Sequence, residues 1–257
     1  MTGLVDLSGK RGLVVGIANQ QSIAYGCAQA FRAAGAELAV TYLNEKARPH
    51  VQPLAEELEA PIFMPCDVRE SGQVRDLFDT LSRQWGNLDF VLHSIAFAPK
   101  DDLHSRVVDC SREGFSQAMD VSCHSFIRMA RYAEPLMTNG GSLMTLTYYG
   151  SEKVVEHYNL MGPVKAALES TVRYMAAELG DHGIRVHALS PGPMKTRAAS
   201  GISRFDELME KAAARAPDKR LGTIEEVGNV AAFLASDASR GVTGEVTYVD
   251  HGEHIMH

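Results

Sequence analysis

The sequence predicts an α/β protein with a doubly wound, seven-stranded parallel sheet and helices on both faces. Seven short apolar runs alternate with amphipathic stretches, which is typical of parallel strands joined by helical crossovers. The chain has 257 residues, of which 45% are apolar, and it shows no internal repeat, low-complexity segment or Pro/Gly/Ser-rich linker. We therefore expect residues 1–257 to form one domain that binds its ligand at the carboxyl ends of the strands.

The expected strands are short apolar runs, and the first is typical of them. Residues 11–16 read R-G-L-V-V-G, a nearly continuous apolar run that indicates a strand buried on both faces. The other expected strands cover residues 37–42, 61–65, 88–94, 142–147, 184–190 and 245–250. The expected helices cover residues 22–34, 45–58, 71–84, 112–137, 159–179 and 224–234. Gly35 is the expected end of the first helix, and Gly180 or Gly183 that of the fifth.

The bulk composition excludes several classes of function. The formal net charge is −7 and the pI is about 5.8, so a nucleic-acid partner is not expected. The amino terminus lacks an apolar signal segment, and no apolar run reaches the length of about 18 residues that a membrane span needs. The four cysteines are scattered and include no C-x-x-C pair, which favours reduced thiols. We expect a cytoplasmic protein with no metal site and no membrane partner.

The turn after the first strand is suited to a dinucleotide phosphate. Gly16 lets the backbone turn tightly and approach a pyrophosphate, and the next helix directs its amino terminus at the same place. Ser22 can add a hydroxyl donor. The G-x-G-x-x-G pattern is absent, so an ordinary strand-to-helix turn is the alternative interpretation.

The residues after the second strand bear on the choice of cofactor. Leu43 stands where an acid would bind the adenosine ribose, and Glu45 follows slightly late. No arginine-rich cluster is present to hold a 2′-phosphate, so the sequence favours NADH over NADPH. Lys46 and Arg48 keep NADPH open as the alternative.

The third and fourth strands end in further candidate contacts. Asp67 can accept a hydrogen bond from an adenine amino group or can cap the next helix. After the fourth strand, the small residues Ser94 and Ala96 let the backbone pass close to a ribose. His93 is interpreted as a packed or hydrogen-bonded residue rather than a metal ligand or proton carrier.

Two tyrosines and a lysine form the strongest chemical pattern. Nine residues separate Tyr148 from Tyr158, and six separate Tyr158 from Lys165. Lys165 is seven positions after Tyr158, which in a helix is close to two turns, or about 10 Å along the axis. Pro163 is tolerated only near a helix start, so Tyr158 is expected at or just before an amino terminus, with Asn159 as a candidate cap.

These motifs together resemble one family. The segments G-I-A-N-Q-Q-S-I-A-Y-G, C-D-V, H-S-I-A-F-A-P, Y-x9-Y-x6-K and A-A-S-G-I are similar to those of bacterial enoyl-acyl-carrier-protein reductases. These enzymes are a divergent branch of the short-chain dehydrogenase/reductases, which have a Rossmann-type fold. The resemblance covers about residues 5–252. Ordinary members of the superfamily carry Y-x3-K, which is absent at both tyrosines.

The resemblance implies a reaction and a role for each residue. NADH would reduce the C=C bond of a trans-2-enoyl thioester on an acyl carrier protein, the last reductive step of a fatty acid elongation cycle. Lys165 would bind the nicotinamide ribose, and Tyr158 would donate to the thioester oxygen as charge builds there. Tyr148 would line the pocket and play an auxiliary part. The family also implies a homotetramer.

The implied binding residues fall into two groups. The cofactor group contains Gly16, Ser22, Ile23, Leu43, Asp67, Val68, Ser94, Ile95, Ala96, Lys165, Met194 and Thr196. The substrate group contains Phe97, Ala98, Leu103, Tyr148, Tyr158, Met161, Ile202 and Phe205.

A substrate lid is expected over about residues 194–215. Small and apolar residues suit a mobile cover over an acyl chain. An acidic carrier protein would favour a basic rim at its mouth. Positive and negative residues are mixed there: Lys195, Arg197 and Arg204 beside Asp206 and Glu207. The carrier is therefore less clearly indicated than the chemistry.

The carboxyl-terminal tail departs from the superfamily pattern. His251 replaces the glycine that commonly follows the last strand's aspartate, and His254 and His257 follow at intervals of three. A solvated or interface tail is favoured over a metal site.

Two other functions stay open at this stage. One is a carbonyl reductase of the same superfamily, which the missing Y-x3-K disfavours. The other is a non-catalytic dinucleotide-binding protein, which the intact Tyr158 and Lys165 disfavour.

Overall fold

All seven expected strands are present and form one parallel sheet. The computed structural model describes residues 5–197 and 199–256, and its strand order is β3-β2-β1-β4-β5-β6-β7. The strands are β1 Arg11–Val15, β2 Glu37–Tyr42, β3 Ile62–Pro65, β4 Phe90–His93, β5 Gly141–Leu146, β6 Ile184–Pro191 and β7 Val246–Val249. The chain builds outward from β1 to β3, then crosses back to β4 on the other side of β1. This reversal places the topological switch point between β1 and β4, where ligands bind in such folds.

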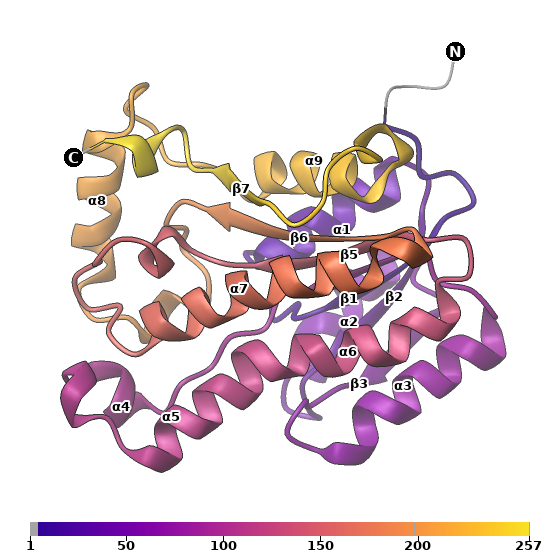
Figure 1. The fold of residues 1–257 in the computed structure, drawn as a ribbon, viewed down its shortest axis with the longest axis horizontal. Helices are drawn as coiled ribbons and strands as arrows, with labels where there is room; N and C mark the ends of the chain where they lie inside the picture. Colours follow the sequence, from indigo (N-terminus) through magenta and orange to yellow (C-terminus); the bar gives the residue numbers. More distant parts are fainter. Residues whose placement is uncertain (1–4, 198, 257) are drawn as a thin grey trace.

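Helices cover both faces of the sheet (Figure 1). The helices are α1 Ile23–Ala33, α2 Arg48–Glu57, α3 Ser71–Gln84, α4 Lys100–His104, α5 Arg112–Met119, α6 Ser125–Ala133, α7 Met161–Leu179, α8 Phe205–Arg215 and α9 Ile224–Ala235. Residues of α1, α2 and α9 share one apolar core, and residues of α3, α6 and α7 share the other. Along β1, Leu13 and Val15 enter one core and Val14 the other, which explains the continuous apolar run in the sequence.

Several predicted boundaries differ from the structure. The expected helix over residues 112–137 is interrupted by a π-helical turn at Asp120–His124 and finishes as a 3-10 turn at Glu134–Leu136. The helices α4 and α8 were not expected as separate elements. Gly35, with φ +101°, does follow the end of α1. Gly180 begins a 3-10 turn after α7, and Gly183 then takes the left-handed conformation.

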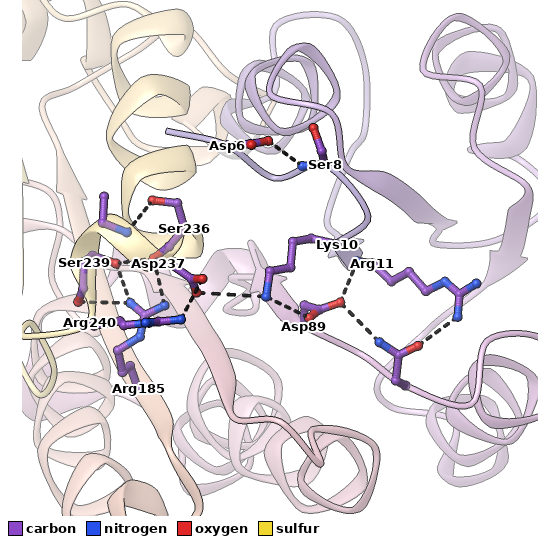
Figure 2. A network of polar contacts seen from close by, with 12 residues as sticks. Asp6, Ser8, Lys10, Arg11, Asp89, Arg185, Ser236, Asp237, Ser239 and Arg240 are labelled. Atoms are coloured by element: carbon purple, nitrogen blue, oxygen red, sulfur yellow. Dashed lines mark hydrogen bonds and ion pairs between the residues drawn. The ribbon is translucent and has the colours of Figure 1, made fainter. Parts of the chain in front are cut away.

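Polar contacts close the amino-terminal edge of the sheet (Figure 2). Lys10 lies 3.3 Å from Asp89 and 4.0 Å from Asp237, and Asp89 also accepts from the Arg11 backbone at 2.8 Å. Beyond them, Arg185 donates to the Leu234 carbonyl at 2.8 Å and so joins β6 to the end of α9. The charged groups of this edge are thus bound to one another, and the carboxyl-terminal edge is the one available for chemistry.

The carboxyl-terminal tail is packed rather than freely solvated. His251 has φ +56° and contacts Asp218 at 2.7 Å and Glu226 at 3.0 Å. His254 contacts Asp250 at 2.9 Å, and its ring stacks on Tyr248 with centroids 3.7 Å apart. The sequence favoured a solvated or interface tail, and these two side chains instead bind carboxylates of the same chain. His257 lies outside the described residues.

The described part of the chain contains neither a metal-binding cluster nor a membrane-spanning helix. Within residues 5–197 and 199–256, no group of three or more His, Cys, Asp or Glu side chains could hold a metal ion. No helix in those ranges has the length and apolar character that crossing a membrane requires.

We expect His251→Gln to reduce stability more in acid than in alkali. Hydrogen bonds to Glu226 and Asp218 raise the pKa of His251 in the folded protein. The resulting stabilisation is fully present below the unfolded pKa and is lost as pH rises through the folded pKa. Both carboxyls stay ionised in mild acid because contact with His251 lowers their pKa, and Arg220 also contacts Asp218.

Calorimetry at two pH values checks this expectation. The melting temperature of the variant should fall below wild type by about 2–4 °C near pH ~5.5 and by much less near pH ~8.5. An equal decrease at both would assign the effect to packing.

Candidate active site

The predicted site residues gather in one pocket at the carboxyl ends of β1, β4, β5 and β6. The pocket has a volume of about 240 Å³. Its lining contains most of the predicted residues: Gly16, Ser22, Ile23, Ser94, Ile95, Ala96, Phe97, Ala98, Leu103, Tyr148, Tyr158, Met161, Lys165, Met194, Thr196, Ile202 and Phe205. Residues from opposite ends of the chain thus meet at the switch point between β1 and β4.

Three predicted cofactor residues lie outside this lining. Leu43 and the pair Asp67 and Val68 follow β2 and β3 at the same edge of the sheet, so their adenosine contacts stay predictions. Asp67 accepts from the Arg69 backbone and guanidinium, and this hydrogen bonding holds the pKa of its carboxyl below the usual value. It does not cap α3, because the residue at that cap is Glu70.

The pocket also has lining residues that the sequence reasoning missed. They are Ala18, Leu146, Thr147, Pro191, Gly192, Pro193, Arg197, Ala199 and Leu208. Leu146 and Thr147 end a predicted strand, so the rule that ligands bind at carboxyl ends was a usable signal for both. Arg197, Ala199 and Leu208 fall within the lid expected over about residues 194–215, although none of them was named as a binding residue.

The first turn is built by close approach of two strands. Gly16 has φ +115°, and a Cβ atom there would lie 2.0 Å from the Ser94 carbonyl oxygen. The Ser22 hydroxyl accepts from the backbone N–H of Ala18 at 3.0 Å and of Asn19 at 3.1 Å. Ser22 therefore holds the turn in shape, and the amino terminus of α1 faces the pocket.

Tyr158 lies in the loop that leads into α7. The helix begins at Met161, and its cap position is Leu160. The prediction that Asn159 caps this helix is wrong, because Asn159 is left-handed with φ 40° and its amide donates to the Leu103 carbonyl at 2.9 Å. Pro163 stands in the first turn, where a proline is tolerated.

The two tyrosines pack edge to face in the pocket wall. The ring centroids of Tyr148 and Tyr158 are 5.0 Å apart, with an interplanar angle of 71°. Burial raises the pKa of Tyr158, and the charge of Glu169 raises it further. Burial likewise raises the pKa of Tyr148. Both phenols therefore remain protonated donors across the physiological range.

Lys165 is a buried cation in the wall of the pocket. Its side chain is buried, and its Nζ donates to the Leu146 carbonyl at 2.8 Å. Burial lowers the pKa of Lys165 to about 8, and the charge of Glu169 opposes this effect. The ammonium form thus prevails below that pH.

His93 is a structural residue, as the sequence predicts. Its ring is fully buried, with Nδ1 3.0 Å from the Thr145 hydroxyl and Nε2 2.7 Å from the Ser125 hydroxyl. Burial, with a smaller contribution from Lys165, lowers the pKa of His93 to about 3. The ring is neutral and fixed between two strands and a helix.

Residues of the segment that the sequence assigns to a lid form part of the pocket lining. Ile202 and Phe205 line the pocket from this side, and Figure 1 shows α8 beyond the carboxyl-terminal edge of the sheet. The basic residues of the mouth are close to acids. Lys195 contacts Asp206 at 3.1 Å, and Arg204 contacts the neighbouring Glu207 at 2.9 Å.

Comparison with known proteins identifies the family. The model of the family described as "Enoyl-(Acyl carrier protein) reductase" matches residues 16–254. The chain belongs to this family.

Relatives of the enoyl-(acyl carrier protein) reductase family match the chain over nearly its whole length. An "Enoyl-[acyl-carrier-protein] reductase [NADH] 1" from Rhizobium meliloti is 50% identical and covers 97% of this chain and 92% of its own. The crystal structure of the NADH reductase from Aquifex aeolicus superposes with a TM-score of 0.95 at 48% identity and covers 99% of both chains. The enzyme from Anaplasma phagocytophilum, solved in complex with NAD, has a TM-score of 0.94 at 48% identity and covers 100% of this chain and 97% of its own.

We expect Gly16→Ala to disrupt the site of this family member. The added Cβ would overlap the Ser94 carbonyl, and φ +115° is strained for any L side chain. Urea unfolding should show a loss of at least about 3 kcal/mol.

A second glycine serves as the matched control. Gly180→Ala adds the same methyl group at φ −61° with nothing within 4 Å, so its effect should stay within about 1 kcal/mol of wild type. Equal losses in both variants would contradict the close-approach explanation.

Proposed function

We propose that the chain reduces the C=C bond of trans-2-enoyl thioesters carried by acyl carrier protein, with NADH as hydride donor. This reaction is the last reductive step of a fatty acid elongation cycle. Family membership and the NADH-dependent reductase activity named for its relatives support the assignment. The observation that carries it is the meeting of Tyr158 and Lys165, at their seven-residue spacing, in one pocket at the switch point.

The residues present fit a nicotinamide dinucleotide. The turn at Gly16 leaves room for a close phosphate, and the amino terminus of α1 favours its negative charge. Leu43 leaves no acid at the end of β2, and Arg48 contacts Glu45 at 3.5 Å, which offsets its positive charge. These features support NADH over NADPH. The related Anaplasma enzyme has been solved with NAD.

The side chains of the pocket divide the chemistry between them. When bound, NADH supplies the hydride that the β-carbon of the substrate accepts. Tyr158 donates a hydrogen bond to the thioester oxygen, where negative charge develops, because its raised pKa keeps the phenol protonated. Lys165 adds positive charge and binds the ribose hydroxyls. Tyr148 forms the wall that holds the Tyr158 ring.

The acyl chain lies between apolar side chains and a lid over about residues 194–215. The proposed walls are Phe97, Ala98, Leu103, Met161, Ile202 and Phe205, all of which line the pocket. Ion pairs tie α8 to other segments: Lys211 contacts Glu156 at 2.9 Å, and Arg215 contacts both Glu253 and the Tyr149 hydroxyl. The Lys211–Glu156 pair is exposed and therefore weak enough to break when the lid moves, whereas Glu253 is buried and its pair with Arg215 is the firmer attachment.

We also propose that the protein is a homotetramer. Apolar side chains are exposed on helices that cover the sheet, namely Phe115 on α5, Ile127 on α6 and Tyr174 on α7. An exposed apolar face of this kind supports packing across a two-fold axis. The cytoplasmic location remains a prediction from cysteine usage, with all four cysteines present as free thiols.

One assay tests the reaction class. The loss of NADH absorbance is followed with a 2-enoyl thioester, with a ketone and with no acceptor. Oxidation with the thioester alone supports the proposal. Oxidation with the ketone alone would instead indicate a carbonyl reductase, and binding of NADH without oxidation a non-catalytic protein.

In the same assay, Tyr158→Phe should lower kcat by about 100-fold and change NADH affinity little, because only the oxyanion donor is lost. Lys165→Met should weaken NADH binding by about tenfold or more, since a charged hydrogen-bond donor is removed. Tyr132→Phe, on an exposed tyrosine of α6 that has no part in the pocket, is the control and should match wild type. Unchanged turnover in Tyr158→Phe would refute its assigned role.

The lid is tested by removing the ion pair between Lys211 and Glu156. Lys211→Met removes the contact with Glu156 and should raise KM for the thioester by about threefold with kcat nearly unchanged, because only a closed-lid contact is lost. Limited proteolysis should cut faster within residues 194–215. If Lys211→Met is cleaved faster than wild type only outside residues 194–215, the segment does not act as a lid.

A further inference from the structure

Two neighbouring turns of α7 hold the end of β5. Lys165 donates from Nζ to the Leu146 carbonyl at 2.8 Å. One turn further along α7, Glu169 accepts from the Thr147 hydroxyl through Oε1 at 2.6 Å. Leu146 and Thr147 are consecutive, and Tyr148 is the next residue. The helix therefore contacts the strand end at two successive residues, directly before the tyrosine of the pocket wall.

Glu169 is an unusual residue to find in this position. Its side chain is 4% exposed, and Thr147 and Lys165 are 4% and 5% exposed. Desolvating a carboxylate is costly unless it is hydrogen-bonded and lies near a positive charge. The Thr147 hydroxyl provides the hydrogen bond. Lys165, four positions earlier on the same helix, is the nearby cation whose pKa the charge of Glu169 raises. The mechanism proposed above assigns Glu169 no task.

The charge of Glu169 acts on the catalytic groups around it. It raises the pKa of Lys165 against the effect of burial, and it also raises the pKa of Tyr158. On the other elements, Cys123 in the π-helical turn and His93 on β4 also face Lys165. The imidazole of His93 stays neutral, since its pKa is about 3.

The surroundings of Glu169 include one more titratable group. Tyr248 on β7 faces this carboxylate, and burial raises the pKa of Tyr248 to about 12. That phenol is uncharged over the working range of an enzyme. Lys165 and Glu169 are therefore the two charged groups whose interaction changes when either charge is removed.

We propose that Glu169, held by the Thr147 hydroxyl, is a positioning residue that keeps the Lys165 ammonium charged and directed at the end of β5, where the cofactor ribose binds. The inference rests on the proposed function for the role of Lys165. Glu169 touches neither cofactor nor substrate and acts through the lysine. Without the charge of Glu169, Lys165 loses its proton at lower pH. It then also loses the positive charge that favours binding of the dinucleotide.

The decisive variant is Glu169→Gln. The amide keeps the volume and an oxygen that can accept from Thr147, and it removes only the charge. NADH affinity is measured by fluorescence titration between about pH 6 and pH 9, without acyl substrate. Affinity should be within about twofold of wild type near pH ~6, about fivefold weaker near pH ~8 and about tenfold weaker near pH ~9, as a midpoint lowered by about one pH unit requires.

Further variants separate charge from packing. Glu169→Asp keeps the charge and should restore most of the affinity near pH ~8. Thr147→Ser keeps the hydroxyl and should resemble wild type, whereas Thr147→Val should shift the midpoint in the same direction as Glu169→Gln. The matched control is Glu178→Gln on the exposed side of the same helix, which should leave the titration unchanged.

A second readout needs no cofactor. The ¹³Cε resonance of Lys165 in lysine-labelled protein, assigned by its loss in Lys165→Met, reports the ammonium directly. Its midpoint should fall in Glu169→Gln. An unchanged midpoint, or a loss of NADH affinity by the same factor at every pH, would overturn the proposal in favour of a packing role. If Glu169→Gln does not fold, Thr147→Val gives the same comparison.

Failure of the proposed function gives a different result. In that case, the wild-type protein shows no NADH oxidation with an enoyl thioester, yet the lysine resonance still shifts between wild type and Glu169→Gln. If the proposed function holds and this inference fails, turnover is present and the lysine midpoint does not move.

Discussion

The hydrogen bond from the Lys165 ammonium to the Leu146 carbonyl is the interaction on which the site depends. It is 2.8 Å long, and it joins α7 to the carboxyl end of β5. Tyr158 precedes α7 and Tyr148 follows β5. The hydrogen bond between these two elements therefore helps to bring the two tyrosine rings together, edge to face, with centroids 5.0 Å apart. Desolvating an ammonium is costly, and a backbone carbonyl offsets part of that cost. A cofactor hydroxyl and a nearby carboxylate would offset more, which links cofactor binding to the state of the lysine.

The charged side chains at the two edges of the sheet have different surroundings. At the amino-terminal edge, Lys10, Asp89 and Asp237 contact one another in the network of Figure 2, and Arg185 binds backbone carbonyls. At the carboxyl-terminal edge, Lys165 is buried beside a pocket. All amino ends of parallel strands meet at one edge of the sheet and all carboxyl ends at the other. Charged side chains pair at both edges, as Lys195 does with Asp206, but Lys165 lines the pocket at the carboxyl ends.

Sequence reasoning succeeded where local pattern and topology agree. Strands buried on both faces read as apolar runs, and the carboxyl-end rule then placed Gly16 and Ser94 at the pocket. It failed where a tertiary contact decides the local conformation. The position and residue type of Asn159 predict a helix cap, but its side-chain amide donates a hydrogen bond to the Leu103 carbonyl instead. The π-helical turn at Asp120–His124 has no local signal either, since the helical pattern continues through it.

The position of Tyr158 outside the helix connects the spacing to the reaction. In a ketone, the oxygen sits on the carbon that accepts hydride, so a phenol one helical turn from the lysine can reach it. In an enoyl thioester, hydride goes to the β-carbon, and the oxygen lies two carbons further along the conjugated chain. The donor must then stand further from the nicotinamide. Seven positions and a loop entry to α7 separate Tyr158 from Lys165. Gly150 makes room for the Tyr158 ring, because a Cβ there would lie 2.6 Å from Tyr158 Cδ1. Side-chain packing, rather than the helix, therefore sets where this phenol lies.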